Sequence, residues 1–218
     1  ALGAEIYITR SDVGKDHPEY YQDLTDRLAQ EQGGFYVNQF ANPANPKVHE
    51  ETTGPEIWEQ MEHKVDAVIA AVGTGGTITG LSRFFARVSP HTEMVLADPV
   101  GSIVAEYVQT GKVPTNVGSW LVEGIGEDFI PPVADLARVK KAYSIPDAEA
   151  FTTCRDLLER EGIFAGTSSG TLIAAALRYC REQKSEKRVV TLVCDSGNKY
   201  LSKVYNDYWM LDQGFIKR

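Results

Sequence analysis

The residues most suited to chemistry lie in a glycine- and threonine-rich segment, residues 70–80, which reads Ala-Ala-Val-Gly-Thr-Gly-Gly-Thr-Ile-Thr-Gly. The apolar run 67–72 before the first glycine is continuous, as in a buried parallel strand. Apolar residues then recur at helical spacing, at Leu81, Phe84, Phe85 and Val88. A glycine loop between a strand and a helix N-terminus binds anions, because unpaired N–H groups and the helix dipole both face the ligand. We therefore predict an anion site at Gly73, Thr74, Gly75, Gly76 and Thr77, where the two hydroxyls add donors.

The position of Ile78 reduces the range of ligands that the loop could bind. A P-loop has a Lys followed by Ser or Thr after its last glycine, and Ile78 stands where that Lys would be useful. The dinucleotide fingerprint needs a third glycine at the same place, counted from Gly73. A compact Gly-Thr-Gly-Gly-Thr loop suits one isolated phosphate, as in pyridoxal phosphate. A tight strand-to-helix turn without a ligand is the simpler alternative.

Three further segments carry polar side chains at candidate loop positions. Asp195-Ser-Gly-Asn198 follows the predicted strand 188–194, where ligands lie in open parallel sheets. Gly166-Thr-Ser-Ser-Gly170 is a second glycine and hydroxyl loop, which opens the predicted helix 172–181 and rivals the first as an anion site. The segment 122–131 places two glycines beside three carboxylates.

Strand and helix patterns alternate almost throughout the chain. Strands are predicted at 5–9, 35–37, 67–72, 94–97 and 188–194. Helices are predicted at 18–32, from Thr53-Gly54-Pro55 onward, after residue 80, at 147–162 with Asp147 as cap, at 172–181 and at 200–210. The Asn- and Pro-rich segment 38–46 is predicted to be irregular. This alternation predicts an α/β fold with a mostly parallel sheet covered by helices on both faces.

The composition and charge of the chain argue against some classes of binding partner. The chain of 218 residues has a net charge of −8 and a pI near 5.1, which argues against nucleic acid or an acidic membrane as partner. No apolar run has transmembrane length, and no signal peptide opens the chain. Cys154, Cys180 and Cys194 are predicted to be buried, reduced thiols of a cytoplasmic protein. Histidines without ligand spacing predict that no metal is bound; they are His17, His49, His63 and His91.

Several motifs in the same order and spacing carry a family resemblance. They are Gln39-Phe-Ala-Asn-Pro-Ala-Asn-Pro46, Thr52-Thr-Gly-Pro-Glu-Ile57, Gly73-Thr-Gly-Gly-Thr77, Glu123-Gly-Ile-Gly126, Gly166-Thr-Ser-Ser-Gly170 and Asp195-Ser196. Over nearly its whole length the chain resembles the fold-type II pyridoxal-phosphate enzymes, the family of cysteine synthase and cystathionine β-synthase. Residues 122–131 and the tail 205–210 look more like the bacterial cystathionine β-synthases.

The resemblance implies a three-layer fold like that of the tryptophan synthase β-subunit, with pyridoxal 5′-phosphate as cofactor. Gly73 to Thr77 would hold its phosphate, and Ser196 would hydrogen-bond its pyridine nitrogen, unless the neighbouring Asp195 faces the ring instead. The Gly166–Gly170 segment would support the cofactor pocket without binding a second phosphate.

The resemblance also implies two substrate contacts. Gln39 would contact the substrate carboxylate, and Gly124 would let the backbone approach the bound amino acid closely. Glu127 departs from the better-known relatives; we predict a plain surface carboxylate, with contact to a second substrate as the alternative.

The largest departure from the family is an absence. The family's Schiff-base lysine and its upstream Ser/Thr-Gly-Asn loop have no match in this chain, so no catalytic residue is assigned. In the family, both features lie before the position that corresponds to Ala1 of this chain. We therefore predict that the N-terminal part is missing, that residues 1–45 are a remnant of the small subdomain, and that 46–218 form the large cofactor-binding subdomain. The chain alone is predicted to be inactive.

For the intact enzyme, the resemblance implies β-replacement on L-serine or an activated serine by a thiol, giving cystathionine when the thiol is homocysteine. O-acetylserine sulfhydrylase (cysteine synthase) is the alternative within the class. A non-catalytic binding remnant is the alternative outside it, and a nucleotide-binding domain fits the loop poorly. The partners implied are amino-acid and thiol substrates, and a second copy of the chain in a homodimer.

Overall fold

The computed structural model describes residues 2–10, 13 and 17–217. It divides into two compact units, Ala1–Asn42 and Pro43–Arg218, each of which is described by itself. The division falls three residues before the predicted boundary between 45 and 46. The assignment of the first unit as the remnant of a small subdomain stays a prediction.

The first unit is built around one helix. Helix α1, Tyr21–Gln32, ends where Gly33 adopts a left-handed conformation (φ 63°) and donates its N–H to Ala29, as the Gly33-Gly34 pair predicted. The predicted strands at 5–9 and 35–37 are wrong, because the described residues of this unit contain no strand. A strand needs a neighbour to satisfy its backbone groups, and this unit offers none.

The second unit contains a parallel sheet of four strands, in the order β3-β2-β1-β4. The strands are β1 Ala67–Ala70, β2 Glu93–Pro99, β3 Val139–Ile145 and β4 Val189–Val190. All three pairings are parallel, which confirms the predicted sheet type. Strand β3 was not predicted, and β4 is shorter than the predicted 188–194. Beyond Val190, the Thr191 hydroxyl donates to the Ile69 carbonyl at 3.1 Å, a side-chain bond to β1 just past the last paired residue of β4.

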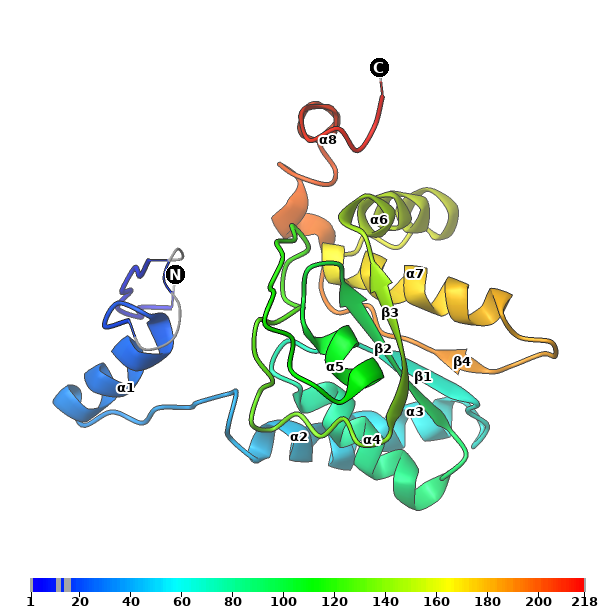
Figure 1. Ribbon diagram of the computed structural model, residues 1–218, viewed down its shortest axis with the longest axis horizontal. Coiled ribbons are helices and arrows are strands. Elements are labelled where there is room, and N and C mark those ends of the chain that lie inside the picture. Colours follow the sequence, from blue (N-terminus) through cyan, green and yellow to red (C-terminus); the bar gives the residue numbers. More distant parts are fainter. Residues whose placement is uncertain (1, 11–12, 14–16, 218) are drawn as a thin grey trace. The chain divides into compact units, whose positions relative to one another are not determined.

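Helices occupy both faces of this sheet (Figure 1). They are α2 Ala44–Val48, the π-helical turn η1 His49–Thr53, α3 Gly54–Gln60, α4 Gly76–Val88, α5 Val104–Thr110, α6 Asp147–Glu161, α7 Thr167–Arg181, the 3₁₀ turn η2 Gly197–Tyr200 and α8 Asp207–Asp212. Side chains alternate across a strand, so each strand contributes to two cores. Ile69 and Val95 pack with residues of α6 and α7, such as Phe151. Val68 and Leu96 pack on the other face, with residues of α3, α4 and α5. The three-layer α/β prediction is confirmed.

Two helix starts differ from the prediction. Residues 44–46 are helical rather than irregular, and α2, η1 and α3 follow one another without interruption. Pro46 lies in the first turn of α2, where a missing N–H removes no helical bond. Asp147 does not cap its helix, since Pro146 holds the N-cap position. The Asp147 carboxylate instead accepts from the backbone N–H of Leu121 at 2.9 Å and of Val122 at 3.1 Å.

The C-terminal segment is less helical than predicted. Over 200–210 the chain forms the end of η2, a series of turns and then α8. Asn206 breaks the run because its side-chain oxygen caps α8, accepting from Tyr208 at 2.9 Å and from Trp209 at 3.3 Å.

The prediction that the cysteines are buried is confirmed for one of the three. Cys154 is buried in α6, whereas Cys180 and Cys194 are exposed, and all three are free thiols. Cys180 lies near the end of α7 and Cys194 lies beyond β4. No group of three or more His, Cys, Asp or Glu side chains in the described residues could hold a metal ion. None of the described helices is long and apolar enough to cross a membrane.

Candidate functional site

The candidate site lies at the carboxyl edge of the sheet, between β1 and β4. From β1 the chain passes through α4 to β2 on one side, whereas β4 pairs with the other side of β1. Open α/β sheets bind ligands at the carboxyl ends of strands where the chain changes direction in this way. The predicted phosphate loop follows β1, and Ser196 follows β4.

The loop after β1 has the backbone geometry of an anion site. Gly75 adopts a left-handed conformation (φ 86°) at the N-cap of α4. The first amide bonded within α4 is that of Thr79, which donates to the Gly75 carbonyl at 3.2 Å. In the described part of the chain, the amides of Gly75, Thr77 and Ile78 donate to no backbone carbonyl. These groups and the positive end of a 13-residue helix fit a phosphate group.

Both predicted threonines of the loop have polar side chains beside them. The Thr74 hydroxyl oxygen accepts from the Asn45 side-chain amide at 2.8 Å and from the Gly76 N–H at 3.4 Å. The Thr77 hydroxyl lies 3.2 Å from Nε2 of His49. These contacts could not be predicted from the sequence, because Asn45 lies in the segment predicted to be irregular.

The loop that carries Gly124 lies directly against the phosphate loop. The Gly126 N–H donates to the Val72 carbonyl at 2.8 Å. A Cβ atom on Gly73 would lie 2.6 Å from the Gly124 carbonyl oxygen, so both backbones approach closely because residue 73 has no side chain. Gly124 has a φ of 84°, which favours glycine there. Its contact with a substrate stays a prediction.

Ser196 is exposed at the same edge of the sheet. Its hydroxyl oxygen accepts from the Asn198 N–H at 3.4 Å. The neighbouring Asp195 points elsewhere: its carboxylate accepts from the Tyr200 hydroxyl at 3.0 Å and packs against Gly166. This geometry supports Ser196 over Asp195 as the ring contact, which remains a prediction.

The segment Gly166–Gly170 forms the N-cap and first turn of α7 and is not a loop. Two of its hydroxyls already accept from backbone N–H groups of other segments. Thr167 accepts from the Glu123 N–H at 3.0 Å, and Ser169 accepts from the Cys194 N–H at 2.9 Å. The segment therefore joins the Gly124 loop to the end of β4, which supports a structural role over a second phosphate site.

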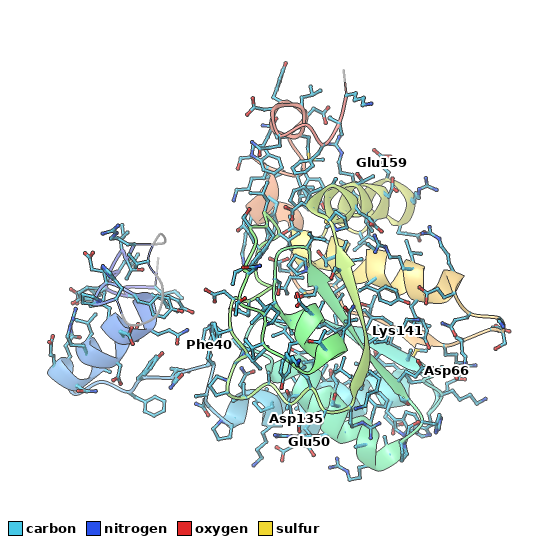
Figure 2. The ribbon with its side chains drawn as sticks, viewed as in Figure 1. Phe40, Glu50, Asp66, Asp135, Lys141 and Glu159 are labelled. Carbon is cyan, nitrogen blue, oxygen red and sulfur yellow. The ribbon has the colours of Figure 1, made fainter. Side chains whose placement is uncertain are left out.

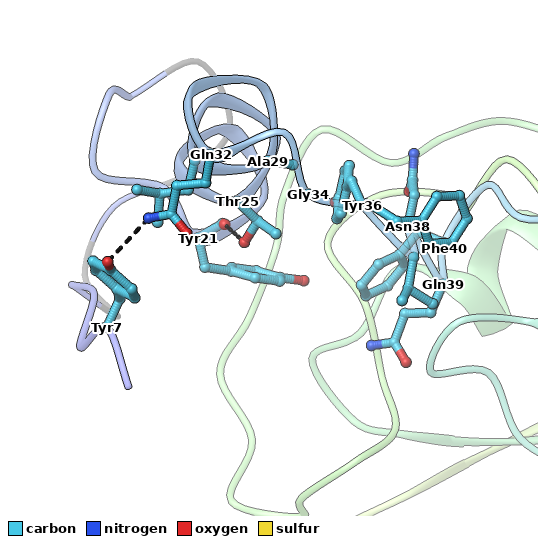
Figure 3. Close-up of a pocket in the computed structure, with 13 residues that line it drawn as sticks. Tyr7, Tyr21, Thr25, Ala29, Gln32, Gly34, Tyr36, Asn38, Gln39 and Phe40 are labelled. Carbon is cyan, nitrogen blue, oxygen red and sulfur yellow. Dashed lines mark hydrogen bonds between the residues drawn. The ribbon is translucent and has the colours of Figure 1, made fainter. Parts of the chain in front are cut away.

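Gln39 belongs to the first unit, where it lines a cavity of about 470 Å³ together with aromatic side chains that include Tyr21, Tyr36 and Phe40 (Figure 3). At another wall of this cavity, Gln32 donates to the Tyr7 hydroxyl at 3.1 Å. The substrate-carboxylate role of Gln39 stays a prediction.

The environment of Glu127 differs from the one predicted from the sequence. It is half-buried rather than a plain surface carboxylate, and no ion pair joins it within the described residues. Burial is the main cause that raises its pKa to about 8, and the charges of Asp128 and Asp98 add to the shift. Burial likewise raises the pKa of Asp98, at the end of β2, to about 6. The only signal in the sequence was the crowding of three carboxylates beside two glycines.

Comparison with known proteins decides the family. The family model described as pyridoxal-phosphate dependent enzyme matches residues 1–195. The chain belongs to this family. It is 39% identical over 218 residues to cystathionine beta-synthase of Oryctolagus cuniculus, covering all of this chain and 39% of that protein. It is 37% identical to cystathionine beta-synthase of Apis mellifera, with 43% of that protein covered.

Cysteine synthase A of Escherichia coli (strain K12) is also 39% identical, over 206 residues that make up 93% of this chain and 63% of that protein. The chain thus spans about two fifths of the length of the cystathionine beta-synthases it matches. The predicted family and its cofactor, pyridoxal 5′-phosphate, are confirmed.

Proposed function

We propose that this chain is the cofactor-binding part of an enzyme that replaces the β-substituent of L-serine, or of an activated serine, with a thiol. With homocysteine as thiol, the product is cystathionine. The observation that carries the proposal is the glycine and threonine loop at the carboxyl end of β1, whose amides at Gly75, Thr77 and Ile78 donate to no backbone carbonyl of the described residues. Relatives named cystathionine beta-synthase match the chain from end to end, which supports the substrate class.

Each site residue has a proposed task. Gly73 to Thr77 hold the phosphate through backbone N–H groups and hydroxyls. Ser196 contacts the pyridine nitrogen, and a hydroxyl there does not hold that nitrogen protonated as a carboxylate would. When bound, pyridoxal phosphate supplies an electron sink for negative charge at the α-carbon of the amino acid. With an unprotonated ring nitrogen that sink is weaker, which suits β-elimination and replacement over transamination. Gln39 binds the substrate carboxylate, and the Gly124 backbone lies against the amino acid.

Cysteine synthase activity is the alternative, since cysteine synthase A is as similar in identity as the first relative. The two candidates differ only in the leaving group and the thiol. The test is product analysis with the complete protein product of the gene. Cystathionine from L-serine and homocysteine supports the first candidate, and cysteine from O-acetylserine and sulfide supports the second. Formation of neither product would contradict both and favour a non-catalytic binding protein.

The lysine that would link covalently to the cofactor is not assigned among the described residues. The two lysines nearest to Ser196 in sequence are paired, Lys199 with Asp195 and Lys203 with Glu123. We therefore propose that the chain alone binds the cofactor without catalysis. A visible spectrum after addition of pyridoxal phosphate and dialysis tests this, because a retained lysine-linked band would contradict it. Homodimer formation and a cytoplasmic location are further proposals, for which sedimentation and cell fractionation are the tests.

A further inference from the structure

Two side chains outside the predicted site lie behind the hydroxyls of the phosphate loop. Asn45 donates its side-chain amide to Thr74 at 2.8 Å. His49 places Nε2 at 3.2 Å from the Thr77 hydroxyl, and its Nδ1 lies 3.0 Å from the Thr53 hydroxyl. Each hydroxyl of the phosphate loop therefore lies beside its own side-chain nitrogen, and both nitrogens belong to residues outside the loop.

The fold brings these two partners to the loop together. Asn45 in α2 and His49 in η1 are four residues apart in consecutive helical turns, so they lie on the same side of that segment. Two glycines of α4, also four residues apart, allow the segment to lie directly against α4. A Cβ on Gly76 would lie 1.9 Å from Oδ1 of Asn45, and a Cβ on Gly80 would lie 2.3 Å from the Pro46 carbonyl oxygen.

The direction of these hydrogen bonds matters for anion binding. A phosphate oxygen only accepts, so a hydroxyl that binds phosphate must donate its single hydrogen to it. The hydroxyl oxygen can then accept from a donor behind it. Asn45 is such a donor toward Thr74. His49 acts in the same way toward Thr77 when its proton is on Nε2, because Nδ1 then accepts from the Thr53 hydroxyl.

We propose that Asn45 and His49 are positioning residues that orient the hydroxyls of Thr74 and Thr77 so that both donate to the cofactor phosphate. This inference rests on the proposed role of the phosphate loop. It assigns a task to the α2–η1 segment, to which the proposed function gives no residue role. Burial lowers the pKa of His49, so a neutral ring with one donor and one acceptor nitrogen is favoured. The adjacent carboxylate of Glu50, which is labelled in Figure 2, is already paired with Arg87 of α4 at 2.8 Å.

Double-mutant cycles with the 218-residue chain test the proposal, with dissociation constants measured for pyridoxal phosphate and for inorganic phosphate. Asn45→Ala and His49→Phe should each weaken the binding of both ligands about tenfold. This is the effect expected when one hydroxyl loses its hydrogen bond to the charged phosphate. Asn45→Ala should have no further effect when Thr74→Val is already present, and neither should His49→Phe when Thr77→Val is present. His49→Gln, which keeps a donor near Nε2, should restore most of the binding.

The matched control is Thr52→Val. Thr52 lies in the same π-helical turn but is exposed, and its hydroxyl donates to the Val48 carbonyl at 2.7 Å. It should bind both ligands like the wild type. Nitrogen-15 NMR of the His49 ring supplies a readout independent of affinity. The phosphate-bound chain should show the proton on Nε2, whereas a proton on Nδ1 alone would overturn the proposal for His49.

The remaining outcomes separate this inference from the proposed function. Additive losses in the cycles would mean that Asn45 and His49 stabilise the loop without acting through the hydroxyls, which overturns the inference and leaves the phosphate site intact. If the wild-type chain binds neither ligand at millimolar concentration, the phosphate site itself is contradicted and the inference falls with it.

Discussion

At the scale of single residues, Glu127 shows how the fold changes the chemistry of a side chain. Ser102 fixes its backbone, accepting the Glu127 N–H at 3.0 Å and donating to its carbonyl at 3.2 Å. The carboxylate itself lies half-buried near Asp98. Since desolvation and like charges both disfavour the ionised form, Glu127 keeps its proton in the folded chain at pH values where the unfolded chain releases it.

This difference predicts a pH-dependent effect of Glu127→Gln on stability. The folded-state pKa of Glu127, about 8, is above its ordinary value of 4.5, so the folded state binds more protons across this window. Its stability is therefore lowered progressively as pH rises from about 4.5 to about 8. The variant lacks this loss, so it should melt at the wild-type temperature near pH 4 and a few degrees higher at pH 8.5.

Thermal melting followed by circular dichroism at several pH values is the measurement. Glu186→Gln is the control, because Glu186 is exposed and is not one of the charges that raise the pKa of Glu127; its difference from wild type should stay small at every pH. A gap between Glu127→Gln and wild type that does not change with pH would contradict the raised pKa.

At the scale of elements, the contact between α4 and the α2–η1 segment positions the phosphate loop. The contact depends on the absence of a side chain at Gly80. A Cβ there would lie 2.3 Å from the Pro46 oxygen, 2.7 Å from Cβ of His49 and 2.8 Å from the Glu50 nitrogen. Two of these three atoms belong to the backbone, so the segment must move as a whole to accept a methyl group.

Gly80→Ala should therefore lower stability despite the higher helix propensity of alanine. Overpacking of this kind costs about 1–3 kcal/mol, and each kcal/mol corresponds to a fall in melting temperature of about 2–4 °C for a chain of this size. Phosphate affinity should fall as well, because Asn45 and His49 move with the segment. Arg83→Ala, at an exposed position of the same helix, should change stability by no more than about 0.5 kcal/mol. Wild-type melting of Gly80→Ala would show that this contact is not tight.

The elements that the sequence predicted correctly are those with a strong local pattern. The apolar run before Gly73 and the helical spacing after Gly80 correspond to β1 and α4. Strand β3 was missed because its residues alternate between buried and exposed only partly and include two lysines. The α2–η1 segment was missed because its asparagines and prolines are typical of loops, whereas its packing against two glycines of α4 is visible only in three dimensions. For the same reason the sequence indicated the phosphate loop but neither Asn45 nor His49 as its partners.

At the scale of the whole molecule, the hydrophobic core lies almost entirely in the second unit. Phe40 is the only buried apolar residue of the first unit among those described. Helix α1 has no buried residue, and an isolated helix of 12 residues is marginal in water. The second unit contains both core clusters, one on each face of the sheet. The free energy of folding should therefore come from residues 43–218.

A protein that starts at Pro43 should accordingly fold without the first unit. We expect a single cooperative thermal transition, within a few degrees of that of the 218-residue chain, and the same dissociation constant for inorganic phosphate. Calorimetry and phosphate titration measure these quantities, and a peptide of residues 1–42 alone should show little helix by circular dichroism. A broad transition, or loss of phosphate binding in the shorter protein, would mean that the first unit contributes to the core or to the phosphate loop. Since every group placed near the phosphate loop lies between Asn45 and Ser196, we expect binding of phosphate to survive and only the proposed contribution of Gln39 to be lost.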